Sequence, residues 1–241
     1  MAGVLITRPY PDAERTAAAV AALGHTPLID PMLTVRPVPG PSLDLRATQG
    51  ILATSVNGVR AIAARTDRRD LPLYAVGGRT AETARQAGFT AVEDAGGNAA
   101  DLAALIALRV DPAKGWLLHV SGRDVAVDLA ALLGPRGYRI TRVVGYEAVA
   151  ADALAPETLA ALDAGGMAYA LFFSPRTART FVSLLRKGKV PAERCAPVEA
   201  LCLSPAVARA LAAEALPWRG VRSAATPDAD ALLALLPPAN G

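Results

Sequence analysis

Hydroxyl side chains follow short apolar segments at several points of this chain. In ALFFSPRTARTF, residues 170–181, Ser174 comes directly after an apolar run and Pro175 stands next to it. Serine at the N-cap and proline at the first helical position are a common helix start. Apolar residues then recur with helical spacing at Ala178, Phe181, Val182 and Leu185. The sequence therefore predicts a strand, a polar turn and a helix whose first N–H groups can bind an anion.

The same arrangement recurs in ILATSVNGVRAI, residues 51–62, which carries Ser55 and Asn57 in the turn. Hydroxyls lie at or just after the ends of predicted strands at Thr7, Ser55, Thr80, Ser121, Ser174 and Ser204. A helix cap alone would explain any one of them, whereas a set at equivalent strand ends indicates a shared anion-binding edge. The turns also contain Gly77 and Gly122, and the neighbouring Arg8 and Arg123 suit carboxylates, although a solvated surface role would explain either arginine as well.

Composition limits the class of protein. A chain of 241 residues fits two domains, and a net charge of +3 with 5% aromatic residues gives little support for nucleic-acid binding. No apolar run is long enough to span a membrane, and the N-terminus lacks the pattern of a secretory signal, so we expect a cytoplasmic protein without a membrane contact. The cysteines and histidines, at Cys195, Cys202, His25 and His119, are too scattered for a metal site or a disulfide framework.

Strands alternate with helices along the chain, which is typical of parallel α/β sheets. Strands are predicted at residues 4–9, 26–35, 50–54, 71–78, 89–94, 116–124 and 138–149. Helices are predicted from Asp12 to Gly24, to about Ala64 after Ser55, over 79–87, over 101–108 and over 125–133. The segment RPVPGP at 36–41 contains three prolines, so we expect it to be extended and to leave the first domain.

An internal repeat sets the domain organisation. The first 35 residues resemble the unit at 116–149, and the units from about 168 onward resemble those that start at 50. This rotated order predicts two similar parallel-sheet α/β/α domains of the flavodoxin or Rossmann type, one made of residues 1–35 and 150–241 and the other of 36–149. The chain would cross between them as a two-stranded extended linker, with a hinged cleft between the domains that is lined by the carboxyl ends of the strands.

Several familiar motifs do not occur. The chain has no G-x-G-x-x-G after a strand, no P-loop and no G-x-S-x-G elbow, so dinucleotide, P-loop and hydrolase functions lack their usual marks.

The ordered set of turn motifs resembles the uroporphyrinogen-III synthase family. The motifs are ITRP at 6–9, TSVNGV at 54–59, AVGGRTA at 75–81, Tyr146 after VVG, FFSPRTARTF at 172–181 and CLSPAVARAL at 202–211. The likeness covers nearly the whole chain. It implies an enzyme that closes linear hydroxymethylbilane into a macrocycle and inverts the last pyrrole ring, through azafulvene and spiro intermediates and without a cofactor or metal. The family tyrosine corresponds to Tyr146 and its domain-end hydroxyls to Ser55, Thr80 and Ser174.

The resemblance also leaves open questions. Where relatives often carry threonine, this chain has Val207, so a hydroxyl there must come from Ser204 or be dispensable. Tyr146 could donate a proton to the departing hydroxyl, or it could be a structural tyrosine packed against the linker. The expected partners are the small-molecule substrate and a transient contact with hydroxymethylbilane synthase, and we expect a monomer. The alternative from another class is a non-catalytic binding module that closes on a small polar anion.

Overall fold

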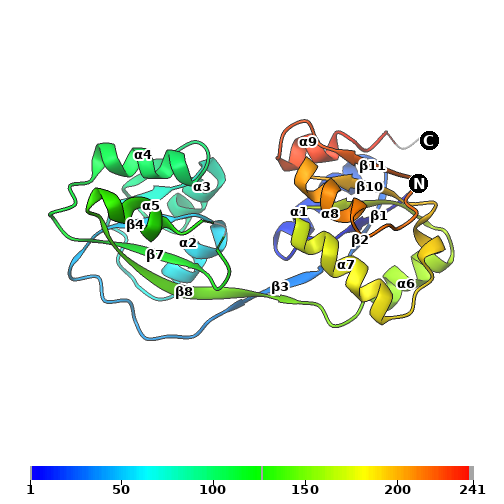
Figure 1. Ribbon diagram of the computed structural model, residues 1–241, viewed down its shortest axis with the longest axis horizontal. Coiled ribbons are helices and arrows are strands. Elements are labelled where there is room, and N and C mark those ends of the chain that lie inside the picture. Colours follow the sequence, from blue (N-terminus) through cyan, green and yellow to red (C-terminus); the bar gives the residue numbers. More distant parts are fainter. Residues whose placement is uncertain (1, 126, 239–241) are drawn as a thin grey trace. The chain divides into compact units, whose positions relative to one another are not determined.

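The structure is a computed structural model that describes residues 2–125 and 127–238. The chain divides into two compact units (Figure 1). The first unit comprises the chain up to Thr34 and from Val149 onward, and the second comprises Val35–Ala148. These boundaries lie one residue before those expected from the repeat.

The first unit is built on a five-stranded sheet in the order β11-β10-β9-β1-β2, with parallel pairing throughout. Its strands are β1 (Gly3–Ile6), β2 (Thr26–Ile29), β9 (Met167–Phe172), β10 (Glu199–Cys202) and β11 (Gly220–Ser223). Its helices are α1 (Asp12–Ala22), α6 (Pro156–Asp163), α7 (Pro175–Lys187), the short η2 (Ala192–Cys195), α8 (Pro205–Ala212) and α9 (Ala229–Leu233). One hydrophobic core joins the sheet to α6, α7 and α8, and a second joins it to α1 and α9.

The second unit is built on a six-stranded sheet in the order β3-β8-β7-β4-β5-β6. Its strands are β3 (Leu33–Pro37), β4 (Thr48–Ala53), β5 (Leu73–Ala75), β6 (Val92–Asp94), β7 (Trp116–Gly122) and β8 (Arg139–Ala150). Its helices are α2 (Val56–Ala63), α3 (Gly78–Gln86), α4 (Ala99–Arg109), α5 (Leu129–Leu133) and the short η1 (Gly134–Arg136). From β8 to β6 the neighbours are parallel. The paired strands β3 and β8 both run across the unit boundary, which gives the predicted two-stranded linker.

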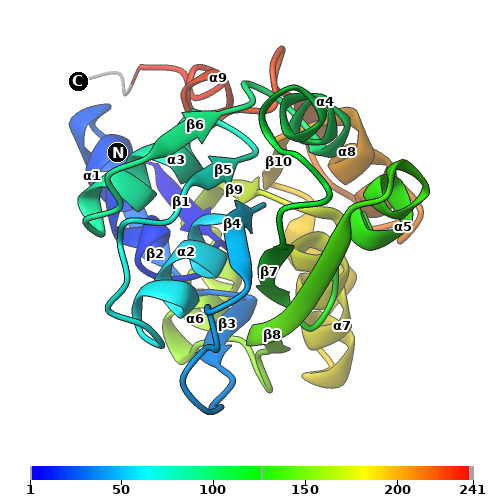
Figure 2. The same ribbon diagram turned by 90° about the vertical axis from the view of Figure 1, so that its left-hand side faces the viewer.

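The two sheets share one topology, which confirms the rotated repeat. Read from its far edge, the second sheet runs β6-β5-β4-β7-β8, and each strand corresponds in turn to β11-β10-β9-β1-β2 of the first. The helices follow the same scheme, because α2 and α3 pack on one face while α4 and α5 pack on the other (Figure 2). Their counterparts are α7 and α8 on one face, with α9 and α1 on the other.

Helix α7 illustrates how local sequence determines an element. Ser174 is its N-cap and Pro175 its first residue, and the Ser174 side chain accepts a hydrogen bond from the Thr177 N–H at 3.1 Å. All four residues of the predicted apolar stripe are buried. Phe181 lies edge-on to Phe172 with 5.5 Å between the ring centroids. Burying such a ring typically contributes about 1.5–3 kcal/mol, so this face of the helix is fixed to the sheet.

Three sequence-based predictions are wrong in detail. The single strand expected at 26–35 is two strands, because Pro31 lacks an N–H for the ladder and Asp30 turns away, accepting a hydrogen bond from the Ala155 N–H at 2.9 Å. Ser121 does not start a helix, since β7 continues through it to Gly122 and α5 begins only at Leu129. Thr80 lies inside the first turn of α3, whose N-cap is Gly77.

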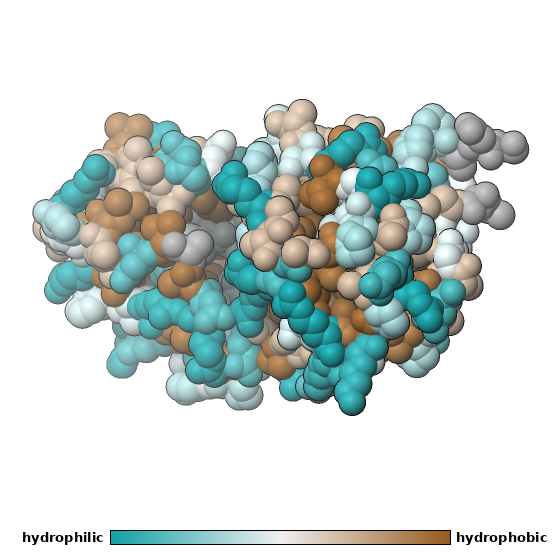
Figure 3. All heavy atoms as spheres, turned by 45° about the vertical axis from the view of Figure 1, so that its right-hand side comes forward, coloured by the Kyte–Doolittle hydropathy of each residue, from teal (hydrophilic) through white to brown (hydrophobic). Residues whose placement is uncertain are grey.

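The helices of the described part of the chain show no membrane span. Across residues 2–125 and 127–238, every helix is too short or too polar to cross a bilayer. The face shown in Figure 3 mixes hydrophilic and hydrophobic residues.

Candidate functional site

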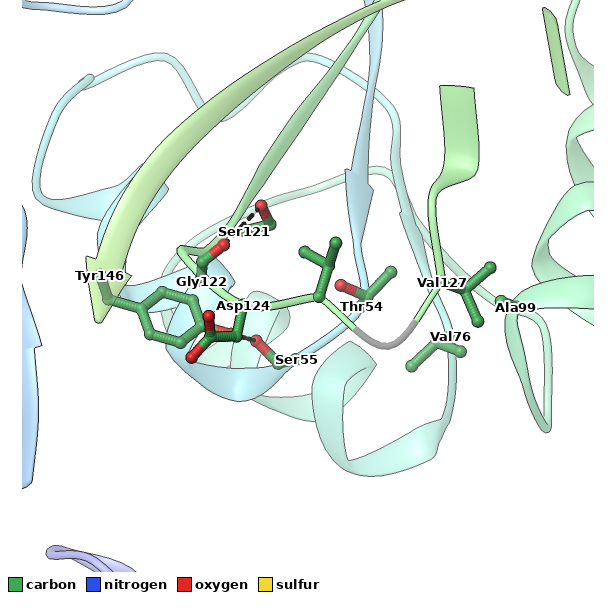
Figure 4. A pocket seen from close by; sticks show the side chains of 10 residues that line it. Thr54, Ser55, Val76, Ala99, Ser121, Gly122, Asp124, Val127 and Tyr146 are labelled. Atoms are coloured by element: carbon green, nitrogen blue, oxygen red, sulfur yellow. Dashed lines mark hydrogen bonds between the residues drawn. The ribbon is translucent and has the colours of Figure 1, made fainter. Parts of the chain in front are cut away.

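A pocket of about 280 Å³ lies within the second unit, where β4, β5 and β7 end (Figure 4). Its lining residues are Thr54, Ser55, Val76, Ala99, Ser121, Gly122, Asp124, Val125, Val127 and Tyr146. Thr54 and Ser55 directly follow β4, Val76 follows β5, and Gly122 is the last residue of β7. This edge of a parallel sheet is where α/β folds bind small molecules.

Ser55 and Tyr146 are joined by a hydrogen bond of 2.7 Å between their hydroxyl oxygens. Ser55 is also the N-cap of α2, where its oxygen accepts a hydrogen bond from the Gly58 N–H at 3.0 Å. The cap fixes the Ser55 oxygen, and the Ser55 oxygen in turn fixes the Tyr146 hydroxyl at the pocket.

Gly122 leaves room for the Tyr146 ring, and Gly145 next to it lets β8 lie close to Val120. Tyr146 is paired with Gly122 across β7 and β8, and a Cβ on Gly122 would lie 2.9 Å from the ring carbon Cε2. Gly145 is equally confined, since a Cβ there would lie 2.5 Å from Cγ1 of Val120. Tyr146 lies within β8, four residues before the strand ends at Ala150.

Ser121 and Arg142 hold the turn after β7 in place. The Ser121 hydroxyl is buried, donates to the Gly122 carbonyl at 3.1 Å and accepts from the Arg142 Nε at 2.8 Å. A second guanidinium nitrogen of Arg142 donates to the carbonyls of Gly122 and Arg123, each at 2.8 Å. Sequence reasoning missed Arg142, because it lies in mid-strand outside every turn motif.

His119 lies behind Thr54, with 3.1 Å between its Nε2 and the Thr54 hydroxyl oxygen. The imidazole is buried in β7, and this burial lowers its pKa to about 4, with the positive charge of Arg142 adding to the effect. His119 is therefore neutral at physiological pH and acts as a fixed hydrogen-bond partner for Thr54.

The pocket brings together four of the predicted site residues, namely Ser55, Ser121, Gly122 and Tyr146. Four others in the same unit do not line it. The Asn57 side chain accepts from Arg60 at 3.3 Å, Gly77 caps α3, Thr80 is buried, and Arg123 pairs with Glu147 at 2.9 Å.

The predicted site residues of the first unit make structural contacts. Thr7 is fully buried and donates to the Leu171 carbonyl at 2.6 Å, so its hydroxyl does not reach a ligand. Arg8 pairs with Asp12 at 3.1 Å and lies 4.4 Å above the Phe173 ring. Ser174 and Ser204 are N-caps of α7 and α8, but only Ser174 accepts a side-chain cap bond.

Metal and thiol chemistry find little support in the described part of the chain. Within it, no group of three or more His, Cys, Asp or Glu side chains is placed to hold a metal ion. Both cysteines are buried, and burial raises the pKa of Cys195 to about 11 and that of Cys202 to about 12. They are protonated thiols of the core.

Comparison with known proteins extends these observations. The model of the family described as "Uroporphyrinogen-III synthase HemD" matches residues 14–234. A uroporphyrinogen-III synthetase structure from Helicobacter pylori shares 19% identity with a TM-score of 0.65, and 97% of each chain is covered. A mutant uroporphyrinogen III synthase from Thermus thermophilus shares 20% identity with a TM-score of 0.53, covering 97% of this chain and 95% of that one. No curated protein matches.

The fold and the pocket define a protein of two like-folded parallel-sheet units with a hydroxyl-rich site at the strand ends of one unit. The structural neighbours share this fold. The family model covers most of the chain, so the chain belongs to the uroporphyrinogen-III synthase family. Membership makes it an enzyme of tetrapyrrole biosynthesis and a cyclising lyase.

Proposed function

We propose that this chain converts linear hydroxymethylbilane into uroporphyrinogen III, closing the macrocycle with inversion of the last pyrrole ring. We place the departure of the substrate hydroxyl at the pocket of the second unit. The observation that carries this placement is the 2.7 Å hydrogen bond between Tyr146 and Ser55, both of which line the pocket.

Tyr146 acts as the proton donor in this proposal. The carbon–oxygen bond of the substrate hydroxymethyl group breaks, its electron pair stays with the oxygen, and the phenol proton converts that oxygen into water. The pyrrole nitrogen lone pair replaces the lost electrons at carbon, which gives the azafulvene cation. The Ser55 oxygen already accepts from Gly58, so its own proton can be donated to Tyr146. That donation leaves the phenol proton directed to substrate and stabilises the phenolate that forms.

The rest of the enzyme must position the linear substrate. Unassisted closure gives the uninverted ring system, so the protein has to direct attack to the substituted carbon of the last ring through the spiro intermediate. The substrate is rich in carboxylates, which suit helix N-termini and arginines. The predicted contacts that we retain are Arg8, Asn57, Gly77, Arg123, Ser174 and Ser204. Thr7 is withdrawn because its buried hydroxyl donates to the Leu171 carbonyl, and Thr80 because it is buried and does not line the pocket.

The remaining expectations form part of the same proposal. Loss of water and ring closure leave the oxidation level of the substrate unchanged, so the reaction requires no redox cofactor, and we propose that the enzyme works without one. We further propose a monomer in the cytoplasm that receives its unstable substrate through transient contact with hydroxymethylbilane synthase. Of these points, the independence from a redox cofactor rests on the chemistry of the reaction.

The test is the isomer composition of the product. Hydroxymethylbilane is incubated with and without the protein, the products are oxidised to porphyrins, and the two isomers are separated and quantified by absorbance. We expect the inverted isomer to dominate with the protein and the uninverted isomer without it. Binding of the bilane without any rise in the inverted isomer would identify a binding module instead.

A further inference from the structure

We propose that Asp124 is a catalytic residue that stabilises the positive charge of the azafulvene cation. This inference rests on the proposed function and adds a group that the turn motifs do not include. Among the described residues that line the pocket, Asp124 carries the only charged side chain. Thr54, Ser55, Ser121 and Tyr146 contribute hydroxyls, and the other lining residues are apolar or glycine.

A carboxylate at this place is informative because the substrate itself is rich in carboxylates. Like charges repel at short range, so the pocket disfavours a carboxylate arm of the substrate. The pyrrole nucleus that bears the hydroxymethyl group is uncharged before reaction and becomes cationic when the hydroxyl leaves. The attraction between the Asp124 carboxylate and the pyrrole therefore arises as the carbon–oxygen bond breaks. An interaction that strengthens in the transition state raises the rate.

The size and walls of the pocket fit one ring. Drug-sized ligands occupy pockets of about 300–1,000 Å³, so a pocket of about 280 Å³ holds one pyrrole nucleus with its hydroxymethyl group and not the four-ring chain. Val76, Ala99, Val125 and Val127 provide apolar walls, and Val125 and Val127 are among the exposed large apolar residues of the protein.

The turn after β7 places Asp124 beside Tyr146, the proposed proton donor. The N–H of Arg123 donates to the Tyr146 carbonyl at 2.9 Å, and Arg142 binds the Gly122 and Arg123 carbonyls. A Cβ on Gly122 would lie 3.3 Å from the Asp124 carbonyl oxygen and 2.9 Å from the Tyr146 ring, so both residues pack around one glycine. Figure 4 shows the Asp124 carboxylate on the side of the pocket where Tyr146 and Ser55 lie.

The chemical balance is simple. The proton that leaves with water comes from Tyr146, so Asp124 neither gains nor loses a proton and forms no covalent bond. Its carboxylate faces the positive charge shared by the pyrrole nitrogen and the methylene carbon until the carbon of the last ring attacks. The charge then passes to the last ring with the new carbon–carbon bond, and it is discharged when the rearranged macrocycle loses a proton, which the Tyr146 phenolate takes up.

The experiment compares Asp124→Asn with Asp124→Glu, using steady-state turnover of hydroxymethylbilane to the inverted isomer. We expect Asp124→Asn to lower kcat by about 10- to 100-fold with KM unchanged or lower. The effect is smaller than for a buried charge because Asp124 is exposed and solvent weakens its attraction for the cation. Asp124→Glu keeps the charge and should stay within about fivefold of wild type. Asp67→Asn is the matched control, since Asp67 is exposed in the same unit, lies outside the pocket and makes the same charge change.

Because Asp124 is exposed, its substitution should leave the fold intact. Circular dichroism and thermal unfolding check that each variant is folded. Asp124→Ser supplies a second neutral side chain and should match Asp124→Asn. A wild-type kcat in either neutral variant overturns the inference, as does a rise in KM with kcat unchanged. A wild-type protein that makes no inverted isomer refutes the proposed function itself, so the two failures are told apart.

Discussion

Replacing Gly122 with alanine displaces the Tyr146 hydroxyl without altering its chemistry. The new Cβ would lie 2.9 Å from Cε2 and 3.1 Å from Cζ of the Tyr146 ring, which is closer than carbon atoms approach. Ordinary contact begins near 3.4 Å, so the ring has to move by about 0.5 Å. The hydroxyl lies beyond Cζ and moves with it, so the 2.7 Å bond to Ser55 lengthens to as much as about 3.2 Å.

This displacement has a calculable effect on rate. A bond of about 3.2 Å between hydroxyls exceeds the usual range of about 2.5–3.0 Å, and misplacing a reacting group by about 1 Å costs on the order of a hundredfold. We expect Gly122→Ala to lower kcat by about 10- to 100-fold. Overpacking should also lower the free energy of unfolding by about 1–3 kcal/mol.

The assay is single-turnover formation of the inverted isomer, measured together with urea unfolding. Gly134→Ala is the control, because Gly134 lies in the same unit with a helical backbone and no neighbouring atom within 4 Å of the added Cβ. The control should leave both kcat and stability near wild type. A Gly122→Ala protein that is folded and turns over within twofold of wild type would show that the position of the Tyr146 ring does not limit the rate.

Two further predictions concern stability. The folded protein keeps the His119 pKa at about 4 against an ordinary 6.5, so the unfolded chain binds an extra proton between these values and stability falls as pH drops through that window, by about 2 kcal/mol from pH 8 to pH 5. Urea unfolding at both pH values should show this slope in wild type and lose it in His119→Gln, and an equal slope in both proteins contradicts the assignment. Ser174→Ala should lower the free energy of unfolding by about 1 kcal/mol, whereas Ser204→Ala should change it by a few tenths, because only Ser174 accepts a side-chain cap bond; equal losses refute this difference.

The sequence predicts those features that depend on short-range patterns. Helix starts at Ser55 and Ser174 follow from N-cap chemistry, and the structure confirms both. The rotated repeat gives the shared strand order, because each copy carries the same succession of strand, turn and helix. The start of the next helix is predicted less well, since Val125 and Val127 resume an apolar pattern after β7 but line the pocket instead of forming helix.

The composition of the site depends on contacts between distant residues. Arg142 reaches Ser121 across 21 residues, and His119 reaches Thr54 across 65. Tyr146 meets Ser55 across 91 residues, and only the family resemblance singled it out beforehand. Such pairs arise from strand order and register, so local spacing carries no signal for them. Asp124 could have been suspected from its place in the SGRD turn, but its approach to the pocket follows from the contacts of Gly122 and Arg142.

The central claim is that Tyr146 donates the proton to the departing hydroxyl, and Tyr146→Phe tests it most directly because it removes one oxygen atom and keeps the ring. Single-turnover formation of the inverted isomer should slow by about 10- to 100-fold, at the low end of general-acid effects because the azafulvene forms readily. Binding of the bilane should stay within about twofold of wild type, since the phenol acts on bond breaking. A folded Tyr146→Phe protein that makes the inverted isomer at near wild-type rate would contradict the claim.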